Sequence, residues 1–373
     1  MTKFKVPFNL PSVVGQEMKF IQESILLGQI SGDGKFTRLA SDFLTQIIGS
    51  EATLLTHSGT AALEMAALLC DLQPGDEVIM PSFTFVSTAN AVVLRGAIPV
   101  FVDIDRNTLN LDPTEVEAAV TDKTRAIFAV HYAGITADMD QLSEISIKNN
   151  IFLIEDAAQA LGSKYKGRAA GSLGDMAAFS FHETKNVISG EGGALAITRP
   201  EMITRAEIIR QKGTNRSEFQ RGQVDKYTWL DVGSSYLPGE MIAAFLYAQL
   251  LEERKITEKR LKNFQTYANA LSDLELSGLV KLPHIPEFCE GNGHIFYLLL
   301  KDSARRDDFI NYMKRHHIST PFHYIPLHSA PGGKHYGKAH GDLKVTNKAS
   351  ASLVRLPNYF SLGDDKLNFV IDK

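Results

Sequence analysis

Short apolar runs alternate with helical patterns through the first 200 residues or so, and this alternation constrains the fold more than any other feature. Four runs have the length and composition of buried strands: residues 77–81, 98–103, 125–130 and 151–155. Helical patterns separate them, such as residues 138–149 and residues 112–120, which begin with Asp112 and Pro113. Strands that alternate with helices need crossover connections, so the sequence predicts an α/β fold with a mostly parallel sheet.

The length of the chain, 373 residues, exceeds that of one ordinary domain. Helical periodicity dominates from Glu240 to Tyr267, and a mixed α/β region with a strand-like run at 295–300 follows. The sequence therefore predicts a large domain over residues 1–250, a long bridging helix that is interrupted or bent, and a smaller C-terminal α/β domain over residues 251–373.

Charge and composition exclude several classes of partner. The formal net charge is -4, and this slight excess of acidic residues does not indicate binding to a nucleic acid or to an anionic membrane. No apolar run resembles a signal peptide or a membrane helix, and we expect a soluble cytoplasmic protein. Cys70, Cys289 and the histidines between 316 and 340 fit no metal-ligand spacing, so no metal site is predicted.

Three of the predicted strands end in a polar residue, namely Asp103, His131 or Asp156. Ligands of open parallel sheets bind beyond the carboxyl ends of the strands, so these positions are candidates for chemistry. An ionised Asp156 at such an end would keep the nitrogen of a pyridine ring protonated. The residue types alone allow an ordinary helix N-cap equally well.

A helical stretch over residues 61–72 begins directly after Ser58, Gly59 and Thr60. The free backbone N–H groups and the positive dipole end of a helix start can hold an anion such as phosphate. Taken alone, the same residues are explained by an ordinary N-cap.

The third segment contains Lys185, in a turn that follows the strand-like run 179–181. Glycines at 190, 192 and 193 then let the chain fold back closely, although they do not form a dinucleotide-binding fingerprint. A lysine held in such a site can lose its proton and act as a nucleophile, whereas a lone lysine is usually solvated. The order of helix start, strand-end aspartate and lysine favours the functional interpretation of all three segments.

With these motifs the chain resembles the DegT/DnrJ/EryC1/StrS family of sugar aminotransferases over essentially its whole length. The motifs that carry the resemblance are residues 31–34, 81–88, 155–159 and 180–186. The resemblance implies the aspartate-aminotransferase (type I) fold, pyridoxal 5'-phosphate (PLP) as cofactor, and a homodimer with shared active sites.

The resemblance also implies a role for individual residues. Lys185 would hold PLP covalently and act as the catalytic base, and Asp156 would pair with the nitrogen of its ring. The remaining implied cofactor contacts are Gln159 near the phenolic oxygen, Phe85 over the ring, and Gly59, Thr60 and Ser180 at the phosphate. Many relatives reach the phosphate of the neighbouring subunit with an asparagine, where this chain has Ser234, Ser235 and Tyr236.

Three further segments, residues 212–217, 221–229 and 322–328, resemble one branch of the family. That branch uses L-glutamate to aminate a dTDP-4-keto-6-deoxy hexose at C4, giving dTDP-4-amino-4,6-dideoxygalactose for surface polysaccharide or antigen biosynthesis. We expect the diphosphate of this nucleotide-linked sugar to meet cations of a long loop over residues 213–235 and its border, and the sugar to meet two aromatic residues. The candidates are Lys212, Arg216, Arg221, Lys226, His323 and Tyr324.

Three other functions compete with this one. Dehydratases with the same fold carry a histidine in place of the cofactor lysine, and Lys185 argues against that activity. An aminotransferase acting at C3 of a keto sugar remains open on the sequence. A non-catalytic sugar-binding protein is disfavoured by the presence of Lys185, Asp156 and the Gly59–Thr60 helix start.

Overall fold

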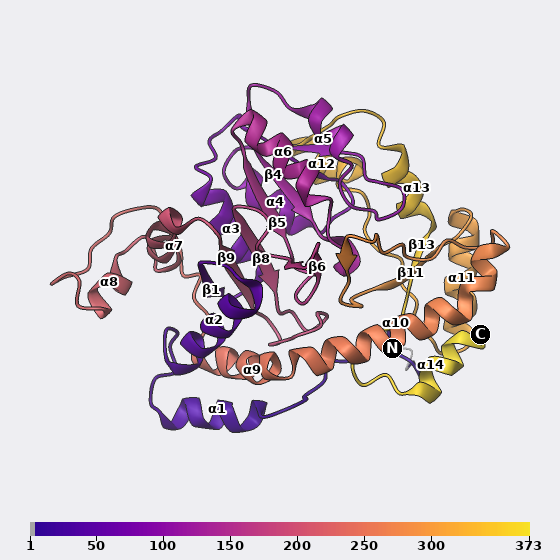
Figure 1. The fold of residues 1–373 in the computed structure, drawn as a ribbon, viewed down its shortest axis with the longest axis horizontal. Helices are drawn as coiled ribbons and strands as arrows, with labels where there is room; N and C mark the ends of the chain where they lie inside the picture. The colour runs from indigo at the N-terminus through magenta and orange to yellow at the C-terminus, as the bar shows by residue number, and fades with distance from the viewer. Residues whose placement is uncertain (1–3) are drawn as a thin grey trace.

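The computed structural model describes residues 4–373, and an eight-stranded sheet forms its centre (Figure 1). Across the sheet the strands lie in the order β1 (Ala52–Thr56), β9 (Gly193–Ile197), β8 (Met176–Ser180), β5 (Phe152–Asp156), β4 (Thr124–Val130), β2 (Glu77–Pro81), β3 (Ile98–Val102) and β12 (Lys338–Ala339). All neighbours from β8 to β12 pair in parallel. The four strands predicted from apolar runs are present, and the α/β fold with a mostly parallel sheet is confirmed.

One strand, β9, runs opposite to its neighbours β1 and β8. Its sequence, from Gly193 to Ile197, contains two alanines and a glycine, which are poor strand formers, and the apolar pattern did not predict it. Pairing on both sides and complete burial of all its residues make it a strand.

Helices cover both faces of the sheet because the side chains of each strand alternate between two apolar layers. In β2, Val78 and Met80 join the cluster around α3, whereas Ile79 joins the cluster that includes residues of α5 and α6. The helices of this region are α1 (Glu17–Leu26), α2 (Lys35–Ile48), α3 (Gly59–Leu69), α4 (Val86–Val93), α5 (Pro113–Ala119), α6 (Met139–Asn149), α7 (Ile203–Arg210), α8 (Arg216–Gln220) and α9 (Glu240–Leu251).

The C-terminal part has a hydrophobic core of its own, with members from Phe264 to Val370. The helical pattern of residues 240–267 forms two helices, α9 and α10, which are interrupted at Glu252. The elements of this part are α10 (Glu253–Leu276), β11 (Phe296–Leu299), α11 (Ser303–Arg315), α12 (Pro331–Tyr336), α13 (Lys344–Ser352), β13 (Leu353–Leu356) and α14 (Asp364–Ile371). β11 and β13 form an antiparallel pair.

Two features cross the division at residue 250 that the sequence suggested. Val6 belongs to the C-terminal core, and β12 pairs with β3 at the edge of the large sheet. We keep the two domains, 1–250 and 251–373, as a proposal. A small sheet of β10 (Cys289–Glu290), β6 (Lys164–Tyr165) and β7 (Arg168–Ala169) also joins the two parts.

An arm formed by residues 211–238 projects from the body of the molecule at the left of Figure 1. It corresponds to the predicted long loop, with the short helix α8 near its tip. Short 3₁₀ turns complete the elements, at Tyr132–Gly134, Pro200–Met202 and Leu327–Ser329. Among residues 4–373 there is no helix with the length and apolar character needed to span a bilayer.

Candidate active site

A cavity of about 780 Å³ opens beyond the carboxyl ends of β4, β5 and β8. Val130, Asp156 and Ser180 are the residues with which these three strands reach it. The first turn of α3, the turn with Lys185, and residues of the C-terminal part complete its walls. The cavity therefore lies at the carboxyl ends of the parallel strands, where the sequence pattern suggested that a ligand binds.

The helix start at Gly59 and Thr60 lines this cavity. The Ser58 hydroxyl caps α3 by accepting a hydrogen bond from the Ala61 N–H at 3.1 Å, so the N-cap interpretation is correct for Ser58. A Cβ atom at position 59 would lie 2.8 Å from the Ser180 Cβ, and glycine thus allows α3 to start directly against β8. Gly59 and Thr60 line the cavity with their backbone, as does the Thr60 hydroxyl, which contacts the Ser87 hydroxyl at 2.7 Å.

Asp156 is the buried carboxylate of the cavity, with 5% of its surface exposed. The Thr88 hydroxyl donates to its Oδ2 at 2.7 Å, and the Ala158 N–H donates to its Oδ1 at 3.2 Å. Thr88 is held in turn by the Thr84 hydroxyl at 3.0 Å. These contacts fix the direction of the carboxylate, and sequence reasoning had missed Thr88 because nothing local marks it.

Lys185 lies in the turn between β8 and β9, and its backbone N–H donates to the His182 carbonyl at 2.9 Å. Burial lowers the pKa of Lys185 from 10.5 to about 8, although the negative charge of Asp156 opposes this shift. Arg355 adds a smaller lowering of the same pKa. The lowered pKa increases the neutral fraction of this amine near physiological pH, and a neutral amine is a nucleophile and a base.

Gln159 connects the sheet to an aromatic wall of the cavity. Its Oε1 accepts from the Ala133 N–H at 2.7 Å, and its Nε2 donates to the Tyr324 hydroxyl at 2.8 Å. The Tyr324 ring stacks on His323 with 3.7 Å between centroids, and Phe85 lies 6.4 Å from Tyr324. The structure thus brings Phe85, Gln159, His323 and Tyr324 together around one cavity.

Residues 292–294 attach the C-terminal part to the turn that carries Lys185. The Asn292 side chain donates to the carbonyls of Gln159 and Leu161, at 2.8 and 2.9 Å. Asn186 donates to the Asn292 carbonyl at 3.0 Å, and its Oδ1 lies 2.8 Å from Nδ1 of His294. The sequence analysis missed this network because its members lie more than 100 residues apart.

The four predicted loop cations do not line the cavity of their own chain. Lys212, Arg216, Arg221 and Lys226 belong to the arm, and Arg221 forms a bidentate pair with Glu207 at 2.9 and 2.8 Å. Ser234, Ser235 and Tyr236 lie at the base of the arm, where the Tyr236 carbonyl accepts from the His57 N–H at 2.8 Å. If these residues contact the substrate or the cofactor as predicted, the cavity that they reach would belong to a second copy of the chain.

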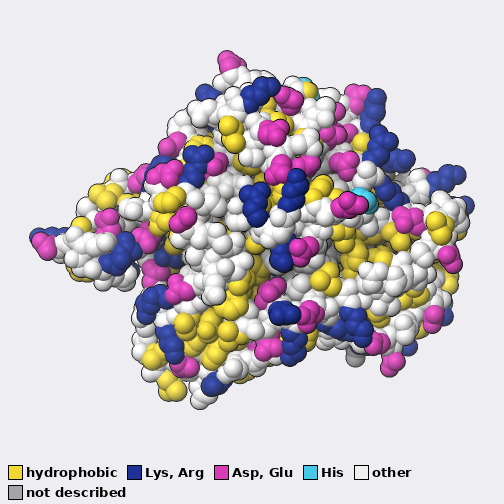
Figure 2. Space-filling model, viewed as in Figure 1, with side chains coloured by type: hydrophobic (Ala, Val, Ile, Leu, Met, Phe, Trp, Pro, Cys, Tyr) yellow, Lys and Arg dark blue, Asp and Glu magenta, His cyan; other side chains and the backbone are white. Residues whose placement is uncertain are grey.

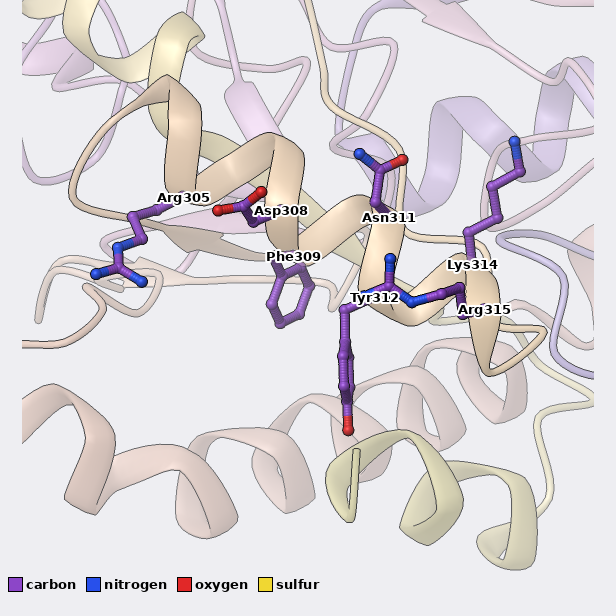
Figure 3. A pocket seen from close by; sticks show the side chains of 7 residues that line it. All are labelled: Arg305, Asp308, Phe309, Asn311, Tyr312, Lys314 and Arg315. Atoms are coloured by element: carbon purple, nitrogen blue, oxygen red, sulfur yellow. The ribbon is translucent and has the colours of Figure 1, made fainter.

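A second hollow runs along α11 in the C-terminal part (Figure 3). Its lining comes from this single helix: Arg305, Asp308, Phe309, Asn311, Tyr312, Lys314 and Arg315. These side chains spread outward from the helix in Figure 3 and do not converge on one point. The cavity at Lys185, with polar groups from several elements, is therefore the candidate active site.

Sequence comparison identifies relatives along the whole chain. A model of the DegT/DnrJ/EryC1/StrS aminotransferase family matches residues 12–373. The chain is 32% identical to the spore coat polysaccharide biosynthesis protein SpsC of Bacillus subtilis, over 98% of this chain and 95% of that protein. It is 35% identical to the pleiotropic regulatory protein of Geobacillus stearothermophilus, over 85% and 82% of the two chains.

Solved structures of similar fold include two aminotransferases. TlmJ from Streptoalloteichus hindustanus has a TM-score of 0.90 at 27% identity, over 98% of this chain and 97% of that chain. Spr1654 from Streptococcus pneumoniae in its PLP form has a TM-score of 0.90 at 25% identity, with the same coverage. The type I fold and the cofactor expected from the sequence are thereby confirmed. The chain belongs to the DegT/DnrJ/EryC1/StrS aminotransferase family and is a PLP-dependent sugar aminotransferase.

Proposed function

We propose that this enzyme transfers the amino group of L-glutamate to C4 of dTDP-4-keto-6-deoxy hexose, giving dTDP-4-amino-4,6-dideoxygalactose. One observation supports the aminotransferase activity most directly: Lys185, Asp156 and the start of α3 line the same cavity. The choice of sugar rests on residues 212–217, 221–229 and 322–328, which resemble the dTDP-4-amino-4,6-dideoxygalactose transaminases of the enterobacterial common antigen pathway. The polysaccharide role in the name of the B. subtilis relative supports a product for the cell surface, such as antigen or lipopolysaccharide.

The residues of the cavity fit PLP at each of its functional groups. The N–H groups of Gly59 and Thr60, with the Ser180 hydroxyl, would hold the phosphate at the positive end of α3. Asp156 would pair with the ring nitrogen, and Gln159 would approach the phenolic oxygen. Phe85 is 58% exposed although it lines the cavity, so a flat aromatic ring can lie against it.

The mechanism that follows assigns proton transfer to Lys185. Bound PLP supplies a protonated pyridine ring that stabilises negative charge on the carbon that loses a proton. The neutral Lys185 amine, favoured by its lowered pKa, takes the proton from the α-carbon of the donor. In the second half of the reaction the same amine, now protonated, would deliver a proton to the sugar carbon that receives the amino group. Asp156, oriented by Thr88, would pair with the ring nitrogen and favour its protonated form.

Exposed apolar side chains support the proposal that two copies share their active sites. Figure 2 shows apolar side chains gathered over α1 at the lower left, where Met18, Ile25 and Leu26 are exposed. The arm also exposes an aromatic residue, Trp229, with 79% of its surface accessible. In a homodimer the arm of one copy would bring its cations to the nucleotide diphosphate bound by the other.

The test is to incubate the enzyme with dTDP-4-keto-6-deoxyglucose and L-glutamate and to identify the amino sugar by NMR. We expect dTDP-4-amino-4,6-dideoxygalactose, and the matching 3-keto isomer serves as the comparison substrate. Amination of the 3-keto sugar alone would replace our proposal with the C3 reaction. A PLP absorbance band that does not change on addition of any amino donor would indicate a non-catalytic sugar-binding protein.

A further inference from the structure

His294, a buried histidine between β10 and β11, makes contacts that fix which of its two ring nitrogens carries hydrogen. The Nδ2 of Asn186 donates to the Asn292 carbonyl at 3.0 Å, so the Oδ1 of Asn186 is the atom that faces Nδ1 of His294, 2.8 Å away. An amide oxygen only accepts hydrogen bonds, and Nδ1 is therefore the ring nitrogen that donates. Nε2 of the neutral ring then keeps a lone pair.

The surroundings of His294 keep its ring neutral. Burial is the main cause that lowers the pKa of this histidine well below 6.5. Four other groups that act on the ring lower the same pKa further, namely Lys185, Arg260, His323 and Arg355. Nε2 is therefore a hydrogen-bond acceptor across the neutral pH range.

The acceptor of His294 has no partner of its own in the chain. The backbone of the residue is held on both sides, since its N–H donates to Oδ1 of Asn292 at 3.0 Å and its carbonyl accepts from Arg260 at 2.7 Å. Nε2 forms no hydrogen bond with any of residues 4–373, the Lys185 amine included, and it is not sealed from solvent. Because His294 and Lys185 line the same cavity, Nε2 offers its lone pair to a ligand bound there.

An acceptor in this cavity distinguishes between the two kinds of substrate that an aminotransferase binds in turn. The amino group of an amino-acid donor is consumed in the reaction, and the carboxylates that remain only accept hydrogen bonds, so a lone pair repels them. A keto sugar instead carries hydroxyl groups, which donate, on carbons next to its carbonyl. In a 4-keto-6-deoxy hexose the only such hydroxyl is the one at C3, because C5 carries the ring oxygen and the methyl group.

We propose that Nε2 of His294 accepts a hydrogen bond from the sugar hydroxyl next to the reacting carbon, which is the C3 hydroxyl of the proposed substrate. This inference rests on the proposed function in taking a keto sugar as the amino acceptor. His294 then selects the sugar and takes no part in the reaction of the amino donor. Holding the carbon next to the carbonyl also places the carbonyl itself for reaction.

The test measures the two half-reactions of the PLP-loaded enzyme separately, each by the change in cofactor absorbance. His294→Asn keeps an amide nitrogen close to the position of Nδ1, where it donates to Asn186, but lacks the acceptor at Nε2. We expect kcat/KM for the sugar to fall by about 10- to 100-fold and kcat/KM for L-glutamate to stay within about twofold. A second sugar, which lacks the hydroxyl next to the carbonyl, reacts at similar rates with both proteins, so the preference for the hydroxyl is lost.

His294→Gln is the matched variant, because its longer side chain returns an amide oxygen close to the position of Nε2 but loses the donor to Asn186. We expect it to recover part of the preference for the hydroxyl. A merely structural role of His294 predicts the reverse order, with the Asn variant active and the Gln variant impaired. His316→Asn is the control, since this histidine packs on Tyr312 at 4.6 Å and does not line the cavity.

Calorimetric binding of dTDP-6-deoxyglucose, which has no carbonyl to react, gives a readout independent of turnover. We expect His294→Asn to weaken this binding by about 10-fold and to leave the binding of the 3-deoxy analogue unchanged. Equal losses for the two compounds would contradict a contact with the C3 hydroxyl.

An unchanged preference for the hydroxyl in His294→Asn, with PLP absorbance retained, overturns the inference. A loss in the glutamate half-reaction as large as that in the sugar half-reaction overturns it as well, because His294 would then act on Lys185 or on the donor. If the wild-type enzyme converts a 3-keto sugar instead, the comparison uses that sugar and its analogues without a neighbouring hydroxyl. A wrong assignment of the sugar thus appears in the wild type, whereas failure of the His294 contact appears only in the variants.

Discussion

At the scale of single residues, the proposed role of Lys185 conflicts with the stability of the fold. Burial makes its amine reactive by lowering the pKa to about 8, but the same burial disfavours the charged form below that pH. The chain tolerates this because neighbouring contacts hold the turn in place, including the Asn186 side chain on the Asn292 carbonyl.

Replacing Lys185 by alanine removes the amine to which, in our proposal, PLP becomes attached. We expect Lys185→Ala to be colourless after dialysis and to show no measurable transamination with L-glutamate. Absorbance spectra and turnover assays check both points, with circular dichroism as the control for folding. A variant that retained full turnover would exclude Lys185 from the mechanism.

Replacing Lys185 by methionine tests the cost of its burial in the cofactor-free protein. The unfolded chain binds a proton at this lysine up to a pKa near 10.5, whereas the folded chain releases it near 8. The unfolded state therefore binds more protons between these values, so wild-type stability rises with pH across this window. We expect Lys185→Met to be more stable than the wild type by roughly 1–3 kcal/mol at pH 7. Urea denaturation should show this difference shrinking towards pH 10.5, and a constant difference would contradict the lowered pKa.

Among the helices, α2 depends on a carboxylate that belongs to α9. Glu240 is 1% exposed and accepts from the N–H groups of Gly34, Phe36 and Thr37 at 2.9, 2.8 and 3.1 Å. It also accepts from the Thr37 hydroxyl. A helix start without a side-chain cap of its own is thus completed from 200 residues further along the chain.

We expect Glu240→Ala to lower the free energy of unfolding by about 2–4 kcal/mol, because it leaves several buried N–H groups without acceptors. Calorimetry or urea denaturation measures the effect. Glu258→Gln is the control, since Glu258 forms an exposed pair with Arg254 worth less than about 1 kcal/mol. An equally small loss for Glu240→Ala would show that water replaces the carboxylate.

For the molecule as a whole, the arm is the segment that takes no part in the cavity of its own chain. Its predicted substrate cations lie outside the cavity of their own chain, and its apolar residues are exposed. Sharing of active sites between two copies accounts for both observations, and this account can be tested by complementation.

The test co-expresses Lys185→Ala chains with chains in which Lys212, Arg216 and Lys226 are alanine. Each homodimer lacks an essential part of both of its sites, whereas a mixed dimer contains one intact site. Random pairing therefore restores about a quarter of the wild-type turnover. Separately purified variants, mixed without exchange of chains, are the control. Full activity of the triple arm variant alone would remove these cations from substrate binding.

The alternation of apolar runs identified the central parallel strands, because burial on both faces of a sheet leaves a pattern in consecutive residues. Local signals also pointed to Gly59 at the start of α3, to Asp156 at the end of β5, and to Lys185 in the turn between β8 and β9. The helical pattern from 240 to 267 predicted a long bridging helix that is interrupted or bent, and the structure has the interruption at Glu252. β9 was missed because its strand conformation depends on its two neighbours.

What the sequence by itself determined was the class of fold, and it pointed to Lys185 and Asp156 as candidate site residues, since each of these inferences depends on residues close together in the chain. Only the tertiary structure decided that Thr88 orients Asp156, that Asn292 and His294 hold the lysine turn, and that Arg355 faces the cavity. It also placed the arm away from the site of its own chain. These partners come from separate elements, and their proximity follows from packing of the whole chain, which leaves no local pattern in sequence.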